Sequence, residues 1–262
     1  MAQPSQVPVR FPSGVSFDYP WGPLANMGAI NPLFYGMWAD DFAVKESTYT
    51  TTATGNGTAA NAANTSATAM GELLFTTNSS TPASGDLVSL QLPAAPFLLQ
   101  AGKKAFFLTR IKMSSATNAA FRVGMAPTGT TTFTGNLANG IYFDKPTGTL
   151  TNLLLTNVSG SAAVTTGIPS SAFTLANATY LDLGWYLDRN STLYAFVGAQ
   201  LVGWLPQSGT GSSVGGRGPV ASPAVSPITL PAGALNMLLA IQSGTAASST
   251  MTVDFWLGAV ER

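Results

Sequence analysis

The sequence predicts an all-β protein, a sandwich of two antiparallel sheets with an extended N-terminal arm. Short runs rich in Phe, Ile, Leu, Val and Met recur along the chain, and clusters of Gly, Pro, Asn and Ser separate them as turn signals. No stretch has the spacing of a long amphipathic helix. The chain has 262 residues, and a β-sandwich can occupy ~250 residues as one unit. We therefore expect a single domain with appendages.

The N-terminal segment, residues 1–36, is predicted to be an extended arm outside the sheets. It carries six prolines, which fix φ and lack an N–H, so it is unsuited to a central strand. It is also too rich in apolar side chains for a solvated tail, and these side chains need a surface. Two arrangements remain open: the arm docks on a neighbouring subunit or larger assembly, or it wraps its own domain. The candidate interface residues are Phe11, Phe17, Tyr19, Trp21, Leu24, Phe34 and Tyr35.

The body of the protein, residues 37–262, begins with a strand expected within residues 38–49. Residues 50–69 are almost wholly Thr, Ala, Asn and Gly, which bury little apolar area, so we expect a low-complexity loop there. Residues 71–77 and 87–93 are the next predicted strands, because a cluster of turn-forming residues separates two apolar runs.

Residues 104–113 and 118–127 are predicted to pair as a hairpin at the centre of a sheet, with a polar turn at 114–118. Strand side chains alternate sides, so the first strand has one mostly apolar face and one face that ends in two cations. The apolar face carries Phe107, Thr109, Ile111 and Met113, and the other carries Phe106, Leu108, Arg110 and Lys112.

Two further hairpins and one long strand are predicted after a Thr- and Gly-rich loop at residues 128–139. The hairpins are residues 141–157 and 193–205, each with a short turn between two apolar runs. Residues 178–188 show the most regular alternation in the chain. Leu181, Leu183, Trp185 and Leu187 face one way, and Tyr180, Asp182, Gly184, Tyr186 and Asp188 face the other.

Residues 207–233 are dominated by Gly, Pro and Ser and are predicted to be a second low-complexity loop. The last two strands are expected at residues 235–242 and 251–260. In the final strand we expect Met251, Val253, Phe255 and Leu257 to share one face. About ten to twelve short strands in this order indicate a two-sheet sandwich.

The composition excludes several classes of function. Eleven basic and eleven acidic residues give zero net charge, so no charged patch is expected to bind nucleic acid or an anionic membrane. The absence of Cys and His excludes thiolate chemistry, the usual Ser-His and Cys-His pairs and the commonest zinc ligand. With so few charges, Ser, Thr, Asn, Gly and Ala must cover the surface, and we expect partners to bury much of it.

The N-terminus does not resemble an export signal. Pro4, Pro8 and Pro12 interrupt the continuous apolar core that a secretory signal needs, and no apolar run approaches the ~20 residues of a membrane span. We therefore expect synthesis in a cytoplasm without export by that route, and no membrane partner.

The order of elements resembles a known fold family. FFLTRIKMSSATNAAFRVGM, GIYFDKPTGTLTNLLL, YLDLGWYLDRNSTLYAFVGAQLVGW, LNMLLAIQSG and TMTVDFWLGAVER together resemble the concanavalin A-like jelly roll of lectins and glucanases. More particularly, they are similar to the small concanavalin A-like proteins encoded among bacteriophage virion genes. The resemblance covers about residues 37–262 and depends on strand pattern. It implies a jelly-roll body and a homotrimer.

The sequence offers no catalytic or metal site. Glucanases of this fold carry a Glu-x-Asp-x-x-Glu motif, which this chain lacks. Its nearest approach is Asp182 with Asp188, but six residues along a strand separate them by about 20 Å. A glycosidase pair must lie ~5 to 9.5 Å apart. The family's metal-binding pattern is also absent, and Asp188-Arg189-Asn190 is typical of a hairpin turn. We predict no enzyme activity, no metal and no cofactor.

The leading hypothesis is a non-enzymatic structural protein of a bacteriophage virion. We expect a capsid decoration or cement protein that binds the major capsid protein, or other virion proteins, at capsomer junctions and stabilises the head. It would act by burying apolar area between subunits, at ~25 cal/mol per Å².

The alternative hypothesis is a glycan-binding module of a tail fibre or other host-recognition appendage. Exposed aromatic rings would stack on sugar rings in that case, and the candidates are Tyr180, Tyr186, Trp204 and Trp256. The competing interpretation for each ring is packing against the second sheet or under a loop.

Overall fold

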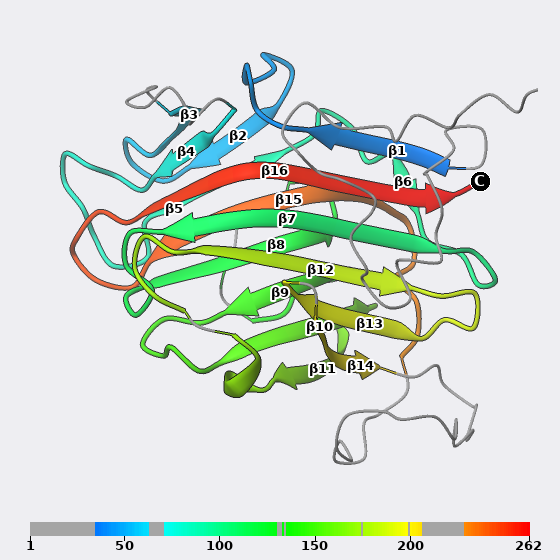
Figure 1. Cartoon of the computed structure of the whole chain (residues 1–262). Helices are drawn as coiled ribbons and strands as arrows, with labels where there is room; N and C mark the ends of the chain where they lie inside the picture. The colour runs from blue at the N-terminus through cyan, green and yellow to red at the C-terminus, as the bar shows by residue number, and fades with distance from the viewer. Residues whose placement is uncertain are drawn as a thin grey trace, which may run out of the picture.

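Two eight-stranded antiparallel sheets pack face to face in the computed structural model (Figure 1). The structure describes residues 35–62, 71–129, 133, 135–173, 175–198, 200–205 and 228–262. Within these ranges the helical structure is one 3-10 turn, Ser170–Ala172, and no helix is long and apolar enough to cross a membrane. The predicted all-β, two-sheet sandwich is confirmed.

Sheet A has the strand order β14-β13-β12-β7-β16-β4-β3, and β1 also pairs with β16. In chain order its strands are β1 (Tyr35–Asp40), β3 (Thr58–Asn61), β4 (Leu73–Thr76), β7 (Ala105–Met113), β12 (Tyr180–Leu187), β13 (Leu193–Val197), β14 (Gln200–Leu205) and β16 (Thr250–Glu261).

Sheet B has the strand order β11-β10-β9-β8-β15-β5-β2, and β6 also pairs with β15. In chain order its strands are β2 (Thr50–Ala53), β5 (Leu87–Gln91), β6 (Phe97–Leu98), β8 (Ala119–Ala126), β9 (Gly140–Lys145), β10 (Leu153–Ser159), β11 (Ala162–Ile168) and β15 (Ala234–Ser243).

The main core lies between the inner faces of the two sheets, as the period-two alternation predicts. On β12 the predicted apolar face is confirmed: Leu183, Trp185 and Leu187 are fully buried in this core. Trp185 stacks on Phe107 of the neighbouring strand β7, with ring centroids 6.2 Å apart. Sheet B supplies the opposite side of the core, with side chains such as Phe121 and Phe143.

The prediction that residues 104–127 form one hairpin is wrong. Strand β7 pairs with β12 and β16 in sheet A, whereas β8 pairs with β9 and β15 in sheet B. Residues 114–118 therefore cross from one sheet to the other. Their backbone groups bond to other segments: the Ser114 N–H donates to the Thr250 carbonyl, and the Ala116 N–H donates to the Asn177 side chain. The apolar faces of β7 and β8 therefore meet across the sandwich, with Phe107 and Phe121 in the same core.

The other two predicted hairpins are confirmed. Strands β9 and β10 pair in sheet B, and β13 pairs with β14 in sheet A. Sixteen strands are described, more than the ten to twelve expected. Among those missed is β11, whose sequence AAVTTGI has little apolar alternation and pairs with β10 through the backbone.

The predicted loop at residues 50–69 is also partly wrong, because it contains strands β2 and β3. Strand β2 pairs with β5 and β3 with β4, so backbone hydrogen bonds hold residues whose side chains bury little. Thr is favoured in strands despite its polarity, which composition alone did not reveal. Residues 63–70 of that predicted loop lie outside the described residues.

The predicted arm and second loop fall mostly outside the described residues. Residues 1–34 of the arm are not described, and strand β1 begins at Tyr35, inside the predicted arm boundary. Residues 206–227 are likewise not described. The end of the second loop packs on the body: Ile228 is buried, and the carbonyls of Thr229 and Leu230 accept hydrogen bonds from Asn157 and Ser159 on β10.

Candidate functional site

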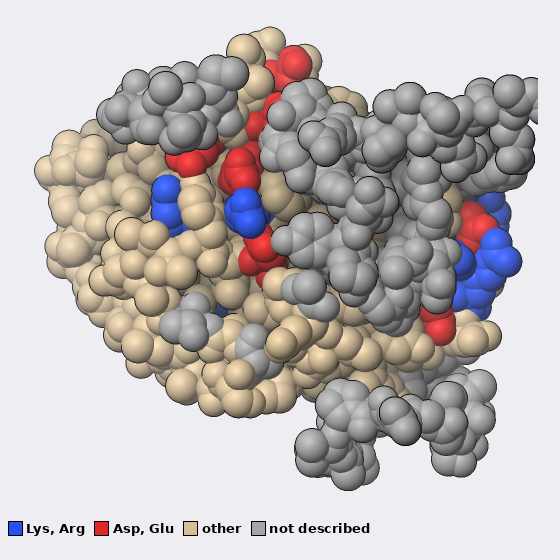
Figure 2. Space-filling view, in the orientation of Figure 1, with Lys and Arg blue, Asp and Glu red and all other residues tan. Residues whose placement is uncertain are grey.

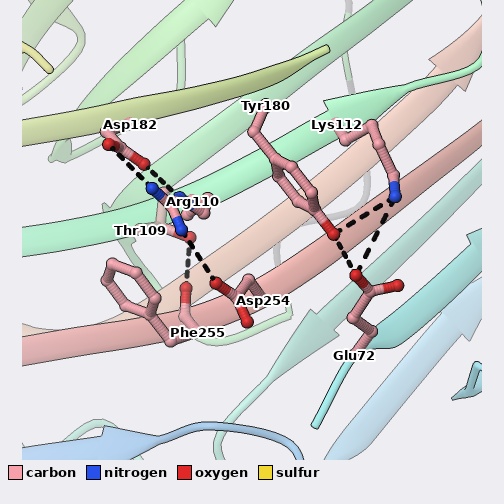
Figure 3. Close-up of polar contacts among 8 residues, drawn as sticks. All are labelled: Glu72, Thr109, Arg110, Lys112, Tyr180, Asp182, Asp254 and Phe255. Atoms are coloured by element: carbon pink, nitrogen blue, oxygen red, sulfur yellow. Dashed lines mark hydrogen bonds and ion pairs between the residues drawn. The ribbon is translucent and has the colours of Figure 1, made fainter. Parts of the chain in front are cut away.

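The outer face of sheet A, turned away from the core, divides into a charged half and an apolar half. On β7, Phe106 and Leu108 belong to the apolar half, and Arg110 and Lys112 follow on the same face, as the alternation predicts. We call six side chains on the charged half the polar cluster: Glu72, Arg110, Lys112, Tyr180, Asp182 and Asp254 (Figure 3). They come from β7, β12, β16 and the residue before β4, which are adjacent in the sheet.

Arg110 is the centre of the polar cluster. Its Nε and Nη2 atoms donate to the two carboxylate oxygens of Asp182, at 2.6 and 3.4 Å. Its Nη1 atom donates to Oδ2 of Asp254, at 3.4 Å. Asp182 lies directly opposite Arg110 on β12, and Asp254 reaches it from β16 on the other side. One guanidinium therefore holds two carboxylates at fixed positions on the sheet (Figure 3).

Tyr180 lies between two cations in the same cluster. The Lys112 ammonium is 4.4 Å from the centre of its ring, and the Arg110 guanidinium carbon is 5.6 Å away. The Tyr180 hydroxyl donates to Glu72, and Lys112 donates to the same hydroxyl at 3.2 Å. Lys112 is also 3.8 Å from Glu72. The phenol ring is thus held at a set angle, with 37% of the residue exposed.

Two carboxylate oxygens of the cluster have no partner among the described residues: Oδ1 of Asp254 and Oε2 of Glu72. Burial raises the pKa of Asp254, although Arg110 opposes the shift. Burial and the hydrogen bond to Glu72 raise the pKa of Tyr180, so its hydroxyl stays protonated. At neutral pH the cluster thus offers acceptor oxygens, cationic donors and an aromatic ring within one surface region.

The polar cluster holds a large share of the few charged residues of the chain. Five of the twenty-two charged residues, eleven basic plus eleven acidic, lie in it. Figure 2 shows Lys, Arg, Asp and Glu gathered in small regions of this side of the molecule, while most of the described surface is uncharged. Among the described residues no group of acidic side chains has the arrangement of a metal site.

A β-bulge in β16 places Asp254 in the cluster. Val253 lies opposite Ile111, but Phe255 lies opposite Arg110, so the chain gains one residue between them. The buried hydroxyl of Thr109 donates to the Phe255 carbonyl at 2.8 Å, which stabilises the irregular backbone (Figure 3). The expected common face of residues 251, 253, 255 and 257 is therefore wrong beyond Val253.

The same bulge removes Trp256 from the candidate sugar-binding platform. Trp256 is fully buried in the core, with ring centroids 5.6 Å from both Phe42 and Tyr49. Without the extra residue, regular alternation would have turned it outward. The prediction that Trp256 is an exposed ring is therefore wrong.

Tyr186 and Trp204 both lie on the outer face, in a row that crosses four strands. The row consists of Phe106, Tyr186, Tyr194 and Trp204, each opposite the next on β7, β12, β13 and β14. Tyr186 stacks on Tyr194 with ring centroids 6.0 Å apart. It is only 5% exposed, so it does not offer an open platform, whereas Trp204 on the edge strand is 37% exposed. We call these four residues the aromatic row.

The sequence pointed to part of this site. It identified the two cations on β7 and the outward direction of Tyr180 and Asp182, but it assigned no role to Asp254 or Glu72. These two residues come from strands far away in the sequence, so no local spacing could have linked them to Arg110. Of the predicted arm residues, Tyr35 is described: it packs edge-on against Phe106, 6.2 Å away, within its own domain. The others lie outside the described residues.

Comparison with known proteins places the fold in the lectin-type, concanavalin A-like jelly rolls. The seed lectin of Lotus tetragonolobus matches with a TM-score of 0.53 and 7% identity, over 87% of this chain and 99% of the lectin. The carbohydrate recognition domain of Emp47p matches with a TM-score of 0.52 and 8% identity, over 87% and 97%. A protein of unknown function from Shewanella oneidensis MR-1 gives 0.55 and 11% identity, over 87% of both chains. At these identities the likeness establishes the fold alone.

No protein-family model and no curated protein sequence matches the chain. The predicted jelly-roll class is confirmed by the structural neighbours. The finer resemblance to bacteriophage virion proteins stays a prediction.

Proposed function

We propose that the protein binds glycans through the polar cluster on the outer face of sheet A. The observation that carries this proposal is the concentration of charged side chains around Tyr180 on an otherwise weakly charged protein. A sugar presents hydroxyl groups, each both donor and acceptor, around a ring with apolar C–H faces. A site of fixed carboxylates, a guanidinium and an exposed aromatic ring complements both features.

The individual groups have distinct roles in this proposal. The oxygens of Asp254 and Glu72 that have no partner among the described residues would accept hydrogen bonds from sugar hydroxyls. Arg110 and Lys112 would donate to sugar oxygens. The ring of Tyr180 would lie against a sugar face. Because the ion pairs already fix these side chains, little conformational entropy would be lost on binding. The lectins and the carbohydrate recognition domain among the structural neighbours support the proposal at the level of fold.

We expect Asp254→Asn and Tyr180→Ala to weaken binding of a recognised polysaccharide about tenfold or more. For Asp254→Asn the basis is that a hydrogen bond to a charged group contributes about 1.5–3 kcal/mol, and each 1.4 kcal/mol is a factor of ten. For Tyr180→Ala the basis is the loss of the ring that would lie against the sugar face. The measurement is isothermal titration with a panel of bacterial surface polysaccharides. Arg189→Ala is the matched control, because it removes an ion pair outside the cluster, between the β12–β13 turn and Glu261 of β16. Saturable binding that survives both cluster variants would contradict the proposal.

We further propose that the cluster binds without cleaving. Asp182 and Asp254 both bond to Arg110, and Glu72 accepts from Tyr180, so each carboxylate is held by a donor. A glycosidase needs one carboxyl as acid and another as nucleophile or base. Release of reducing ends from a bound polysaccharide would overturn this part.

A structural role in a bacteriophage virion is the second candidate. It is favoured by the low proportion of charged residues in the sequence and by the largely uncharged described surface on the side that Figure 2 shows. Such a surface can be buried against the major capsid protein at a low desolvation cost. In this role the protein would decorate capsomer junctions as a homotrimer.

The virion proposal predicts that the purified protein binds heads that lack it and raises the temperature at which they disrupt. Co-sedimentation and a thermal release assay measure the two effects. If the protein neither co-sediments with the heads nor raises the temperature at which they disrupt, the virion proposal fails and the glycan proposal remains.

A further inference from the structure

The charges of the polar cluster do not balance. It contains three carboxylates, those of Glu72, Asp182 and Asp254, and two cations, those of Arg110 and Lys112, so it carries one net negative charge. The Arg110 guanidinium is shared between Asp182 and Asp254, and the Lys112 ammonium is paired with Glu72. A ligand therefore meets cations that already have carboxylate partners within the protein.

Two carboxylate oxygens of the cluster are available to a ligand. They are Oδ1 of Asp254 and Oε2 of Glu72, which have no partner among the described residues. Both are open to solvent, because the buried side-chain atoms without a partner in the described part of the chain belong to other residues. An ionised carboxylate oxygen only accepts hydrogen bonds, and it forms its strongest ones with cationic donors.

The two carboxylates with an available oxygen are neighbours on the sheet. Strands β4 and β16 pair with Leu73 opposite Val253, and Glu72 and Asp254 are the next residue along each strand. Burial raises the pKa of Asp254, Arg110 lowers it, and the nearby charge of Glu72 raises it further. Like charges at neighbouring positions of two paired strands repel each other. A cationic ligand group beside their available oxygens would relieve this repulsion.

The acidic surplus continues beyond the cluster. The segment from the end of β1 to β2 has three acidic residues and one basic residue, which are Asp40, Asp41, Glu46 and Lys45. This segment lies next to the cluster: a Cβ atom on Gly71, the residue before Glu72, would be 2.4 Å from the carbonyl oxygen of Asp41. The surroundings therefore add to the negative potential at the site, which attracts cations and repels anions.

We propose that the polar cluster recognises glycans with free amino groups, whose ammonium binds beside the available oxygens of Asp254 and Glu72, and that it rejects acidic glycans. This inference rests on the proposed glycan-binding function and names the charge class of its ligand. Polysaccharides with unacetylated hexosamine units have the required chemistry. A carboxylate, sulfate or phosphate group on a sugar would instead meet like charge at the site.

Isothermal titration of the full chain with two matched oligosaccharides tests the preference. The probes are β-1,4-linked glucosamine oligomers and the same oligomers with every amine acetylated, so they share one backbone and differ in charge. At about pH 6, below the pKa of an amine and above that of an ordinary carboxyl group, we expect the amine form to bind about tenfold or more tightly. Galacturonic acid oligomers of equal length should show no saturable binding.

Two isosteric substitutions locate the preference. Asp254→Asn with Glu72→Gln removes both charges and keeps the side-chain sizes, so the two glucosamine probes should then bind within about twofold of each other. Asp41→Asn is the matched control, because it removes a neighbouring charge without touching the two available oxygens, and it should keep most of the preference. Circular dichroism verifies that both variants are folded.

The outcomes separate this inference from the function on which it rests. Equal or tighter binding of the acetylated form, or a preference that persists in the folded double variant, would overturn the inference and leave glycan binding standing. The same holds if both glucosamine probes fail while another polysaccharide binds in a way that depends on Tyr180. Absence of saturable binding to every saccharide would overturn both proposals.

Discussion

Trp256→Ala is expected to lower the free energy of unfolding by about 3–5 kcal/mol, the usual cost of truncating a large buried aromatic residue. Trp256 is fully buried and contacts Phe42 and Tyr49, so the change would leave a cavity in the core. Urea denaturation followed by circular dichroism measures the effect, and an unchanged m-value would show that the unfolded state is unaffected.

Trp204→Ala is the matched control for this prediction. The same substitution on the exposed edge strand should cost less than about 1 kcal/mol, because surface changes have small effects. Similar losses for the two variants would mean that Trp256 does not face the core, and would place the bulge in β16 in doubt. The pair of measurements therefore tests the feature that also positions Asp254 beside Arg110.

The contribution of Lys145 to the stability of the protein should rise with pH between 7 and 10. Strand β9 directs Ile141 and Phe143 into the core, and Lys145 follows on the same face and is fully buried. Its ammonium donates to the carbonyls of Ala119 and Thr117, at 2.5 and 3.3 Å, where the chain crosses between sheets. Burial lowers the pKa of Lys145 to about 8.

The sign follows from proton binding. Between the folded pKa of about 8 and the ordinary value of 10.5, the unfolded chain binds more protons than the folded one, so the free energy of unfolding increases with pH. We expect the difference between the natural protein and Lys145→Met to grow by about 2–3 kcal/mol from pH 7 to pH 10. Taking this difference cancels the contribution of the tyrosines, which both proteins share. A difference independent of pH would show that Lys145 is not desolvated as the structure has it.

The charged half of the outer face illustrates what a local pattern can and cannot predict. The alternation along β7 and β12 is enough to place Arg110, Lys112 and Asp182 on one face of their strands. It cannot pair them, because strand neighbours depend on which distant segments exchange backbone hydrogen bonds. Asp254 and Glu72 become partners of this group only because β16 lies beside β7 and β4 lies beside β16 in the folded sheet.

The four aromatic candidates for the sugar-binding platform also differ in exposure for a reason that lies in the tertiary structure. Tyr180 and Trp204 face outward and are partly exposed, as expected, whereas Tyr186 is covered and Trp256 is in the core. The direction of Trp256 is reversed by one extra residue between Val253 and Phe255, which no feature of the sequence TVDFW reveals.

By itself, the sequence determined the all-β class, the inward face of β12, two hairpins and the absence of cysteine and histidine chemistry. These properties follow from side-chain alternation and composition, which are local or additive. Tertiary structure alone decided that β7 and β8 face each other across the core, that Thr-rich residues form β2 and β3, and that five charged residues meet around Tyr180. Each of these depends on hydrogen bonds and burial between segments far apart in the chain, whose free energy no single stretch of sequence contains.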